Sequence, residues 1–234
     1  MVGRIRGGIW GKLFGGGRMI RICTISHSHV AERQQLFFKE LSKYAEVLVL
    51  SPSRWGRFEV KDEDEGNYHL KAFPVRNEGD VFNWIFDPLA YSAVEEFKPD
   101  IIYYQGDVRI SKEEDGSLML NQAIISQHWA KAVGGKFVMF FWENLRYPTY
   151  TEQEFFKRCD LVIAGNISGK LMYNANLVLP QVGIAIEKFK PLEKKRKVVY
   201  IGRNVPEKGI EYIKKAYPET EFFHYLPYSE VPRV

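Results

Sequence analysis

The residues best suited to chemistry in this 234-residue sequence follow the ends of apolar runs. One run, VVYI (198–201), leads into GRNVPEKG, where Gly202, Arg203 and Lys208 precede an amphipathic segment. A strand, a short loop and a helix start in this order can bind an anion, because ligands of open parallel sheets lie at the carboxyl ends of strands and helix N-termini attract negative charge. Gly202 permits close backbone approach, and the two cations suit a diphosphate. The alternative is an ordinary turn with surface cations.

Three other apolar runs, IRICTI (20–25), PDIIYYQ (99–105) and KFVMFFW (136–142), end in or lead into polar side chains. Because the carboxyl ends of parallel strands share one edge of a sheet, we expect these side chains at the binding edge. Each has a plainer alternative, since loop histidines and loop-capping polar groups are common. The candidates are His27, His29, Gln105, Asp107, Glu143 and Asn144.

Two further motifs imitate known sites. Residues 62–64 read Asp-Glu-Asp, as in metal-dependent sugar transferases, but they lie within the charge run KDEDEG, which is typical of a solvated loop, so we expect no metal there. GNISGK (165–170) follows a strand but is one residue too short for a phosphate loop and lacks the Ser or Thr after its Lys. Cys23 and Cys159 are far apart and form no disulfide or metal pattern, so a cytoplasmic location is expected.

The elements that would position these residues alternate along the chain. Unbroken apolar runs separated by helical patterns predict an α/β fold, a Rossmann-like parallel sheet covered by helices on both faces. The expected strands are 20–25, 46–51, 68–75, 99–105, 136–142, 159–165, 198–201 and 220–226, and the expected helices are 32–45, 81–97 with a break at Pro88, 117–133, 151–158 and 206–217.

Composition divides the chain further. Residues 1–18 form a glycine-rich basic leader that we expect to be disordered, with a weak membrane-surface tether as the alternative and Met19 as an alternative start. The leader holds four of the 33 basic residues, so the other 29 balance the 29 acidic ones, and a basic nucleic-acid binder is not expected. Residues 19–182 read as one Rossmann-like domain, 183–197 as a linker and 198–234 as the start of a second domain.

An ordered set of segments resembles glycosyltransferase family 4 over nearly all of residues 19–234. The interdomain passage LPQVGIAIEKFKP, followed by VVYIGRNVPEKG, has that family's glycine-aliphatic run, Phe-x-Pro, Gly-Arg and Lys-Gly. The other matching segments are ELSKYAEVLVLSPSRW (40–55), FKPDIIYYQGD (97–107), FFWENLRYP (140–148) and RCDLVIAGNISGKL (158–171).

The resemblance implies a retaining transferase of GT-B architecture, in which the first domain binds the acceptor and the second binds a nucleotide-sugar. It assigns the donor diphosphate to Gly202, Arg203 and Lys208, leaves the catalytic residue unknown and implies no metal cofactor. A glycan or lipid-linked molecule would be the acceptor. The acceptor-side candidates are then His27, His29, Gln105, Glu143 and Asn144.

The chain also departs from the family. The family's donor-sugar segment with two glutamates is missing, so we expect a truncated second domain and no activity in the chain alone. The chain would then be either an inactive fragment or one half of a split enzyme that a second chain completes. A non-catalytic glycan- or partner-binding module is the alternative. An unrelated Rossmann-like nucleotide-binding protein is less favoured, because the sequence has no G-x-G-x-x-G.

Overall fold

The computed structural model describes residues 18–110, 119–142, 146–179, 197–202 and 206–223. Contacts divide the chain into two units, with the boundary between Val182 and Gly183, and each unit is described by itself. The predicted leader (except Arg18) and the predicted linker (except Lys197) lie outside the described residues. Among the residues described, no helix combines the length and apolar character needed to cross a membrane.

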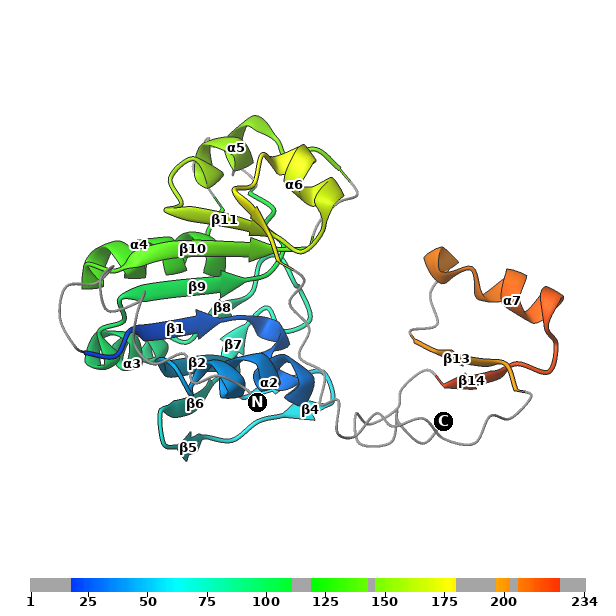
Figure 1. Ribbon diagram of the computed structural model, residues 1–234, viewed down its shortest axis with the longest axis horizontal. Helices are drawn as coiled ribbons and strands as arrows, with labels where there is room; N and C mark the ends of the chain where they lie inside the picture. Colours follow the sequence, from blue (N-terminus) through cyan, green and yellow to red (C-terminus); the bar gives the residue numbers. More distant parts are fainter. Residues whose placement is uncertain (1–17, 111–118, 143–145, 180–196, 203–205, 224–234) are drawn as a thin grey trace, which may run out of the picture. The chain divides into compact units, whose positions relative to one another are not determined.

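The first unit is built on one eight-stranded sheet (Figure 1). Its strand order is β12-β11-β10-β9-β1-β2-β6-β5, and every neighbouring pair is parallel except β5 and β6. The predicted α/β fold with a parallel sheet is therefore confirmed. The strands are β1 (Arg21–Ile25), β2 (Glu46–Pro52), β5 (Glu63–Glu65), β6 (Tyr68–Phe73), β9 (Ile101–Gln105), β10 (Lys136–Phe141), β11 (Leu161–Ala164) and β12 (Leu177–Val178).

Burial on both faces explains the unbroken apolar runs. In β10, Phe137, Met139 and Phe141 belong to one core cluster, whereas Val138 and Phe140 belong to the other. A strand buried on both faces cannot alternate apolar and polar residues, because each side chain meets a covering layer. The apolar run of β10 therefore follows from its central position.

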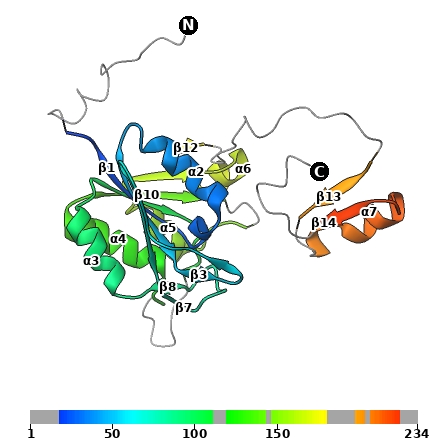
Figure 2. The same ribbon diagram turned by 90° about the horizontal axis from the view of Figure 1, so that it is seen from below.

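Helices cover the sheet on both faces (Figure 2). Helix α2 lies on one face and buries Phe38 there, whereas α3 and α4 lie on the other face and bury Val94 and Ala130. The helical elements of this unit are η1 (His27–Val30), α2 (Glu32–Leu41), α3 (Leu89–Phe97), α4 (Gln122–Val133), α5 (Tyr150–Phe156) and α6 (Ile167–Tyr173).

Polar caps define where several helices begin and end. The Asn121 side chain accepts a hydrogen bond from the Ile124 N–H at the start of α4, and Gly134 ends that helix with a left-handed φ of 74°. Thr149 and Glu152 form a capping box at the start of α5. Such caps satisfy N–H groups that have no partner within the helix.

The helix expected over 81–97 is shorter in the structure. Helix α3 begins at Leu89, after Pro88, and the preceding residues form a turn and a short strand. The Asp80 carboxylate accepts hydrogen bonds from the N–H groups of Phe82 and Asn83, which stabilises the turn. Two small antiparallel pairs that sequence analysis did not anticipate are β3 (Arg54–Trp55) with β4 (Phe58–Glu59) and β7 (Val75–Arg76) with β8 (Ile85–Phe86).

The second unit contains one parallel strand pair and its connection. Strands β13 (Val199–Ile201) and β14 (Glu221–Phe223) are joined through η2 (Pro206–Lys208) and α7 (Ile210–Ala216). Helix α7 buries Ile210, and the rings of Tyr200 and Phe222 contact each other with centroids 5.8 Å apart. This is a strand-helix-strand unit of the kind found in Rossmann-like domains.

Two adjacent phenylalanines test the packing of α2. Phe38 is 1% exposed and packs against Tyr103, whereas Phe37 is 36% exposed. We expect Phe38→Ala to lower the free energy of unfolding by about 3–5 kcal/mol, because it leaves a cavity in the core. Phe37→Ala, the matched control, should cost much less. Urea unfolding measures both, and equal losses would contradict the placement of α2.

Candidate functional site

The order of the strands identifies the edge at which a ligand would bind. From β1 the chain moves outward to β2 and β6, then returns to β9 on the other side of β1. In open α/β sheets, ligands bind outside the carboxyl ends of the strands at such a reversal. The residues after β1 and β9 therefore form the candidate site of the first unit.

His27 follows β1 and lies within a group of aromatic rings. It is half-buried, and its ring centroid is 5.0 Å from Trp55 and 5.9 Å from Trp84. Its Nδ1 is buried without a hydrogen-bond partner among the described residues. Burial lowers the pKa of His27 to about 4, because desolvation penalises the imidazolium form, so the ring is neutral near pH 7.

His29 lies in the core beneath this edge, although we expected both histidines to face the cleft. It is 0% exposed, and its Nδ1 donates a hydrogen bond to the Leu50 carbonyl at 3.0 Å. That bond places the proton on Nδ1, so Nε2 accepts from the Thr24 hydroxyl at 3.3 Å. Burial lowers the pKa of His29 to about 4, only partly opposed by the bond to Leu50. Both ring nitrogens are thus occupied within the protein.

Gln105 and Asp107, at the end of β9, also use polar atoms inside the fold. The buried Gln105 donates a hydrogen bond from Nε2 to Oε1 of Gln34 at 3.1 Å and thereby links β9 to α2. Asp107 accepts a hydrogen bond from the Trp142 N–H at 2.9 Å, which joins the ends of β9 and β10. Of the described candidates in this unit, His27 is the one whose ring has no hydrogen-bonded partner among the described residues.

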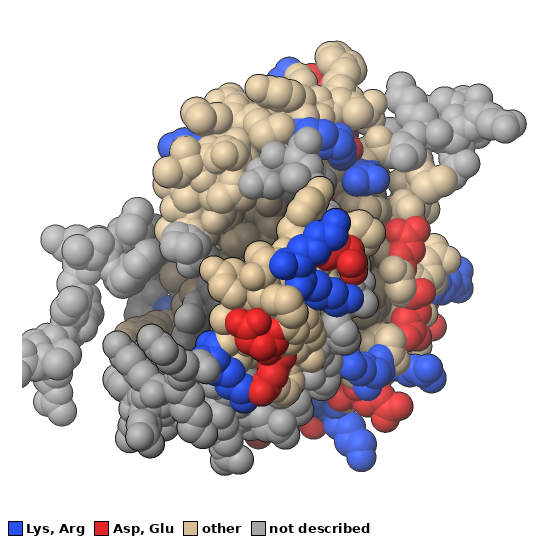
Figure 3. Space-filling view, turned by 90° about the vertical axis from the view of Figure 1, so that its right-hand side faces the viewer, with Lys and Arg blue, Asp and Glu red and all other residues tan. Residues whose placement is uncertain are grey.

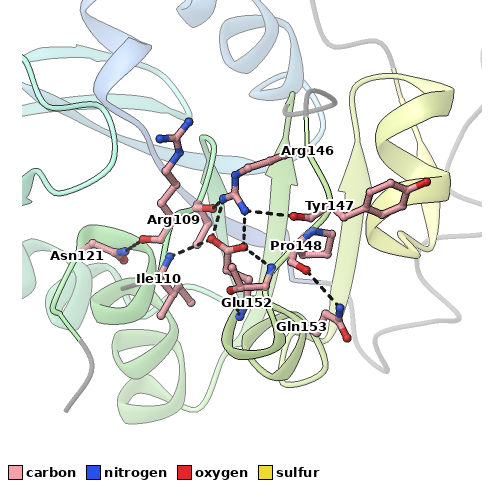
Figure 4. Close-up of polar contacts among 10 residues, drawn as sticks. Arg109, Ile110, Asn121, Arg146, Tyr147, Pro148, Glu152 and Gln153 are labelled. Atoms are coloured by element: carbon pink, nitrogen blue, oxygen red, sulfur yellow. Dashed lines mark hydrogen bonds and ion pairs between the residues drawn. The ribbon is translucent and has the colours of Figure 1, made fainter. Parts of the chain in front are cut away.

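Glu152 organises the loops after β9 and β10 and was not among the residues expected from sequence (Figure 4). Its carboxylate is buried and accepts hydrogen bonds from the N–H groups of Ile110 (3.1 Å) and Thr149 (2.8 Å). The guanidinium of Arg146 adds two bonds, at 2.7 and 2.8 Å. The Thr149-x-x-Glu152 spacing was a readable signal of the cap, but not of its other partners.

The pKa of Glu152 reflects this network. Burial alone would raise the pKa, but the Arg146 guanidinium and the N–H groups of Thr149 and Ile110 outweigh burial and hold the pKa below its usual value. Glu152 is therefore charged at neutral pH and paired, which makes it a structural clamp between two loops of the edge.

The residues predicted to bind the donor diphosphate lie in the second unit. A Cβ added at Gly202 would come within 2.8 Å of the Tyr200 hydroxyl, the far end of a half-buried side chain that could shift to admit it. Lys208 ends η2 and is exposed. Arg203, like Glu143 and Asn144 of the first unit, lies outside the described residues.

The two motifs that resemble known sites, residues 62–64 and 165–170, have structural roles. Lys71 lies 3.0 Å from Asp64 and 3.6 Å from Asp62, and His69 Nδ1 is 2.8 Å from Asp64, so these carboxylates are paired. The described part of the chain contains no group of three His, Cys, Asp or Glu residues placed to hold a metal. Asn166, in the other motif, caps α6 by accepting from the Gly169 N–H.

Charges of both signs are mixed over the described surface shown in Figure 3. Lys and Arg residues lie beside Asp and Glu residues rather than in one extended basic area of that view.

Comparisons with known proteins support the fold. The sequence matches no family model, and no curated protein matches it significantly. Sucrose-phosphate synthase from Thermosynechococcus elongatus aligns over 92% of this chain and 72% of its own, with a TM-score of 0.53 and 8% identity. Trehalose-6-phosphate synthase from E. coli, bound with UDP-2-fluoro glucose, aligns over 91% of this chain and 68% of its own, with a TM-score of 0.50 and 14% identity.

Both neighbours are GT-B glycosyltransferases. At these identities the likeness shows a shared fold and nothing about substrates. The α/β architecture described above is therefore shared with two glycosyltransferases of known structure.

The two neutral histidines predict how stability depends on pH. Their pKa of about 4 in the folded chain is below the unfolded value of 6.5, so the unfolded state binds protons first as the pH falls. The free energy of unfolding should therefore decrease from pH 6.5 to 4.5 by up to about 1.4 kcal/mol per pH unit for each histidine. Urea unfolding across this range measures the slope.

Two variants test whether the neutral histidines cause this pH dependence of the free energy of unfolding. His29→Gln should reduce it by about half, because one of the two titrating groups is removed. His128→Gln, at an exposed position on α4, should leave the slope unchanged. An unchanged slope in His29→Gln would contradict the account.

A second prediction concerns the clamp. Glu152→Gln should lower the free energy of unfolding by about 2–4 kcal/mol, because it removes the buried carboxylate that pairs with the half-buried Arg146 guanidinium. Glu154→Gln on the same helix removes an exposed pair with Lys157 and should cost less than about 0.5 kcal/mol. Thermal or urea unfolding of the two variants compares them, and similar losses would refute the clamp.

Proposed function

We propose that this chain belongs to a retaining glycosyltransferase similar to family 4, which moves a sugar from a nucleotide-sugar to a glycan or lipid-linked acceptor. The observation that carries the proposal is the structural likeness to sucrose-phosphate synthase, a GT-B glycosyltransferase, over 92% of the chain. The polar residues at the carboxyl ends of β1, β9 and β10 add to it, because they lie where such folds bind ligands.

In this proposal the first unit holds the acceptor. His27 supplies a direct contact at the edge, and Glu143 and Asn144 are assigned to the same role from their position after β10. His29 and Gln105 act indirectly, because their polar atoms are bonded within the fold and hold η1, α2 and β9 together.

The second unit holds the donor. Gly202 allows the backbone to approach the diphosphate, and Arg203 and Lys208 neutralise the charge that grows on the leaving group as the glycosidic bond breaks. A planar guanidinium fork and a mobile ammonium suit two neighbouring phosphates. The acceptor's proton passes to the donor phosphate, so the reaction requires no protein carboxylate as nucleophile.

A further polypeptide completes the second unit in this proposal. Among its described residues, the buried side chains are Ile210 and Thr220. Such a small buried set leaves Tyr212 78% and Tyr217 52% exposed. A unit of this kind gains stability when more chain covers it, whether that chain is covalently continuous or separate.

Turnover with a panel of nucleotide-sugars tests the function. The purified chain is assayed for nucleotide release with glycan acceptors, alone and mixed with the product of the adjacent downstream gene. In whichever mixture is active, Arg203→Ala and Lys208→Ala should each lower turnover by about 10²-fold, since each removes a charge that stabilises the leaving group. Lys215→Ala, an exposed control on α7, should have little effect.

Two outcomes would contradict the proposal. Wild-type turnover in the Arg203 and Lys208 variants would mean that the loop is structural. If calorimetry detects no nucleotide binding and no mixture releases nucleotide, a non-catalytic binding module becomes the better account.

A further inference from the structure

The group of aromatic rings around His27 has the composition of a sugar-binding subsite. Trp55 is half-buried, so part of its indole is open to solvent, and its ring centroid lies 5.0 Å from that of His27. Partly open aromatic rings beside a few polar groups are typical of small-molecule sites. Both residues are at the carboxyl edge of the sheet, next to the strand reversal between β1 and β9.

Trp55 is held in place by a short hairpin. It lies opposite Phe58 in the β3–β4 pair, and Gly56 turns the chain with a φ of 60°. The Gly56 N–H donates a hydrogen bond to Glu78 at 2.8 Å, which fastens the hairpin to another loop. A ring fixed in this way loses little conformational freedom when a ligand stacks on it.

Trp84 supports the pair from below. It is 0% exposed, and its ring contacts Trp55 (6.1 Å between centroids) and His27 (5.9 Å) edge to face. Phe86 and Tyr104 pack against the same indole at 5.1 and 6.5 Å. The positions of His27 and Trp55 are therefore set by the core rather than by a mobile surface.

The His27 imidazole can form a hydrogen bond with a ligand, but it is a weak base. Its Nδ1 is buried without a partner, and no hydrogen bond within the described residues occupies Nε2. Because Nδ1 is buried, Nε2 is the ring nitrogen that a ligand would contact, and a sugar hydroxyl can donate to it or accept from it according to the tautomer. Because its pKa is about 4, His27 is poorly matched to accept a proton at neutral pH and is better suited to positioning.

We propose that Trp55 and His27 form the acceptor-sugar subsite, in which the indole stacks on the apolar face of a pyranose ring and the imidazole hydrogen-bonds one of its hydroxyls. This inference rests on the proposed function, and it specifies the acceptor as a pyranoside. His27 orients the hydroxyl, while the donor phosphate remains the proton acceptor.

Binding of simple glycosides to the full chain tests the subsite. The probes are methyl α-glucoside, methyl α-mannoside, methyl α-galactoside and N-acetylglucosamine, measured by saturation-transfer NMR and tryptophan fluorescence without any nucleotide. At least one probe should bind, with an affinity that stays constant between pH 5.5 and 8 because His27 does not titrate there.

Substitutions of His27 and Trp55, with a matched control, test whether these two side chains contact the glycoside. His27→Ala should weaken binding about tenfold, the equivalent of one hydrogen bond. Trp55→Ala should abolish it, and Trp55→Phe should restore part of it, because a smaller ring still stacks. Trp129→Phe is the control, since this half-buried tryptophan packs against Tyr91 on the helical layer. Urea unfolding confirms that each variant is folded.

The outcomes separate this inference from the proposed function. Absence of binding by every probe, or binding unaffected in the folded Trp55→Ala and His27→Ala variants, overturns the subsite. UDP, GDP and ADP binding, measured by calorimetry in the same samples, reports on the donor side. Retained nucleotide binding without glycoside binding would therefore refute the subsite and leave the transferase proposal standing.

Discussion

The pairing of β1 with both β2 and β9 is the constraint on which the rest of the first unit depends. Cys23 lies in register with Leu48 on one side and Ile102 on the other, so β1 is central and is covered on both faces. Its central position also forces the chain to reverse direction across the sheet at this strand. The same pairing that buries β1 therefore creates the edge at which a ligand binds in such folds.

Polar side chains near this edge differ in whether they are hydrogen-bonded within the fold. His29, Gln105 and Glu152 are buried, and each is hydrogen-bonded to groups from other elements. Unpaired polar groups at these depths would cost free energy, so their partners hold the loops in one arrangement. His27 is different, because its ring is half-buried and its Nδ1 has no hydrogen-bond partner among the described residues.

The sugar-transfer proposal and the aromatic subsite fit the same physical picture. Rings supported by a fully buried Trp84 provide a rigid surface, and a rigid surface reduces the entropy lost on binding. The acceptor role of this surface is part of the proposed function, which starts from the fold shared with GT-B glycosyltransferases. The GRNVPEKG segment belongs to the second unit, so the proposed donor and acceptor roles can be tested by separate variants.

The sequence by itself determined the fold class and most of the elements, because unbroken apolar runs and helix caps are local patterns. It also indicated the edge, since polar residues after buried strands such as β1 and β9 share it. Only the tertiary structure decided that His29 is buried while His27, two residues earlier, meets Trp55 and Trp84. It also showed that residues 81–87 are not helical and that Glu152 bonds to Ile110, 42 residues away. These outcomes depend on contacts between distant segments, and no local pattern encodes which segments will meet.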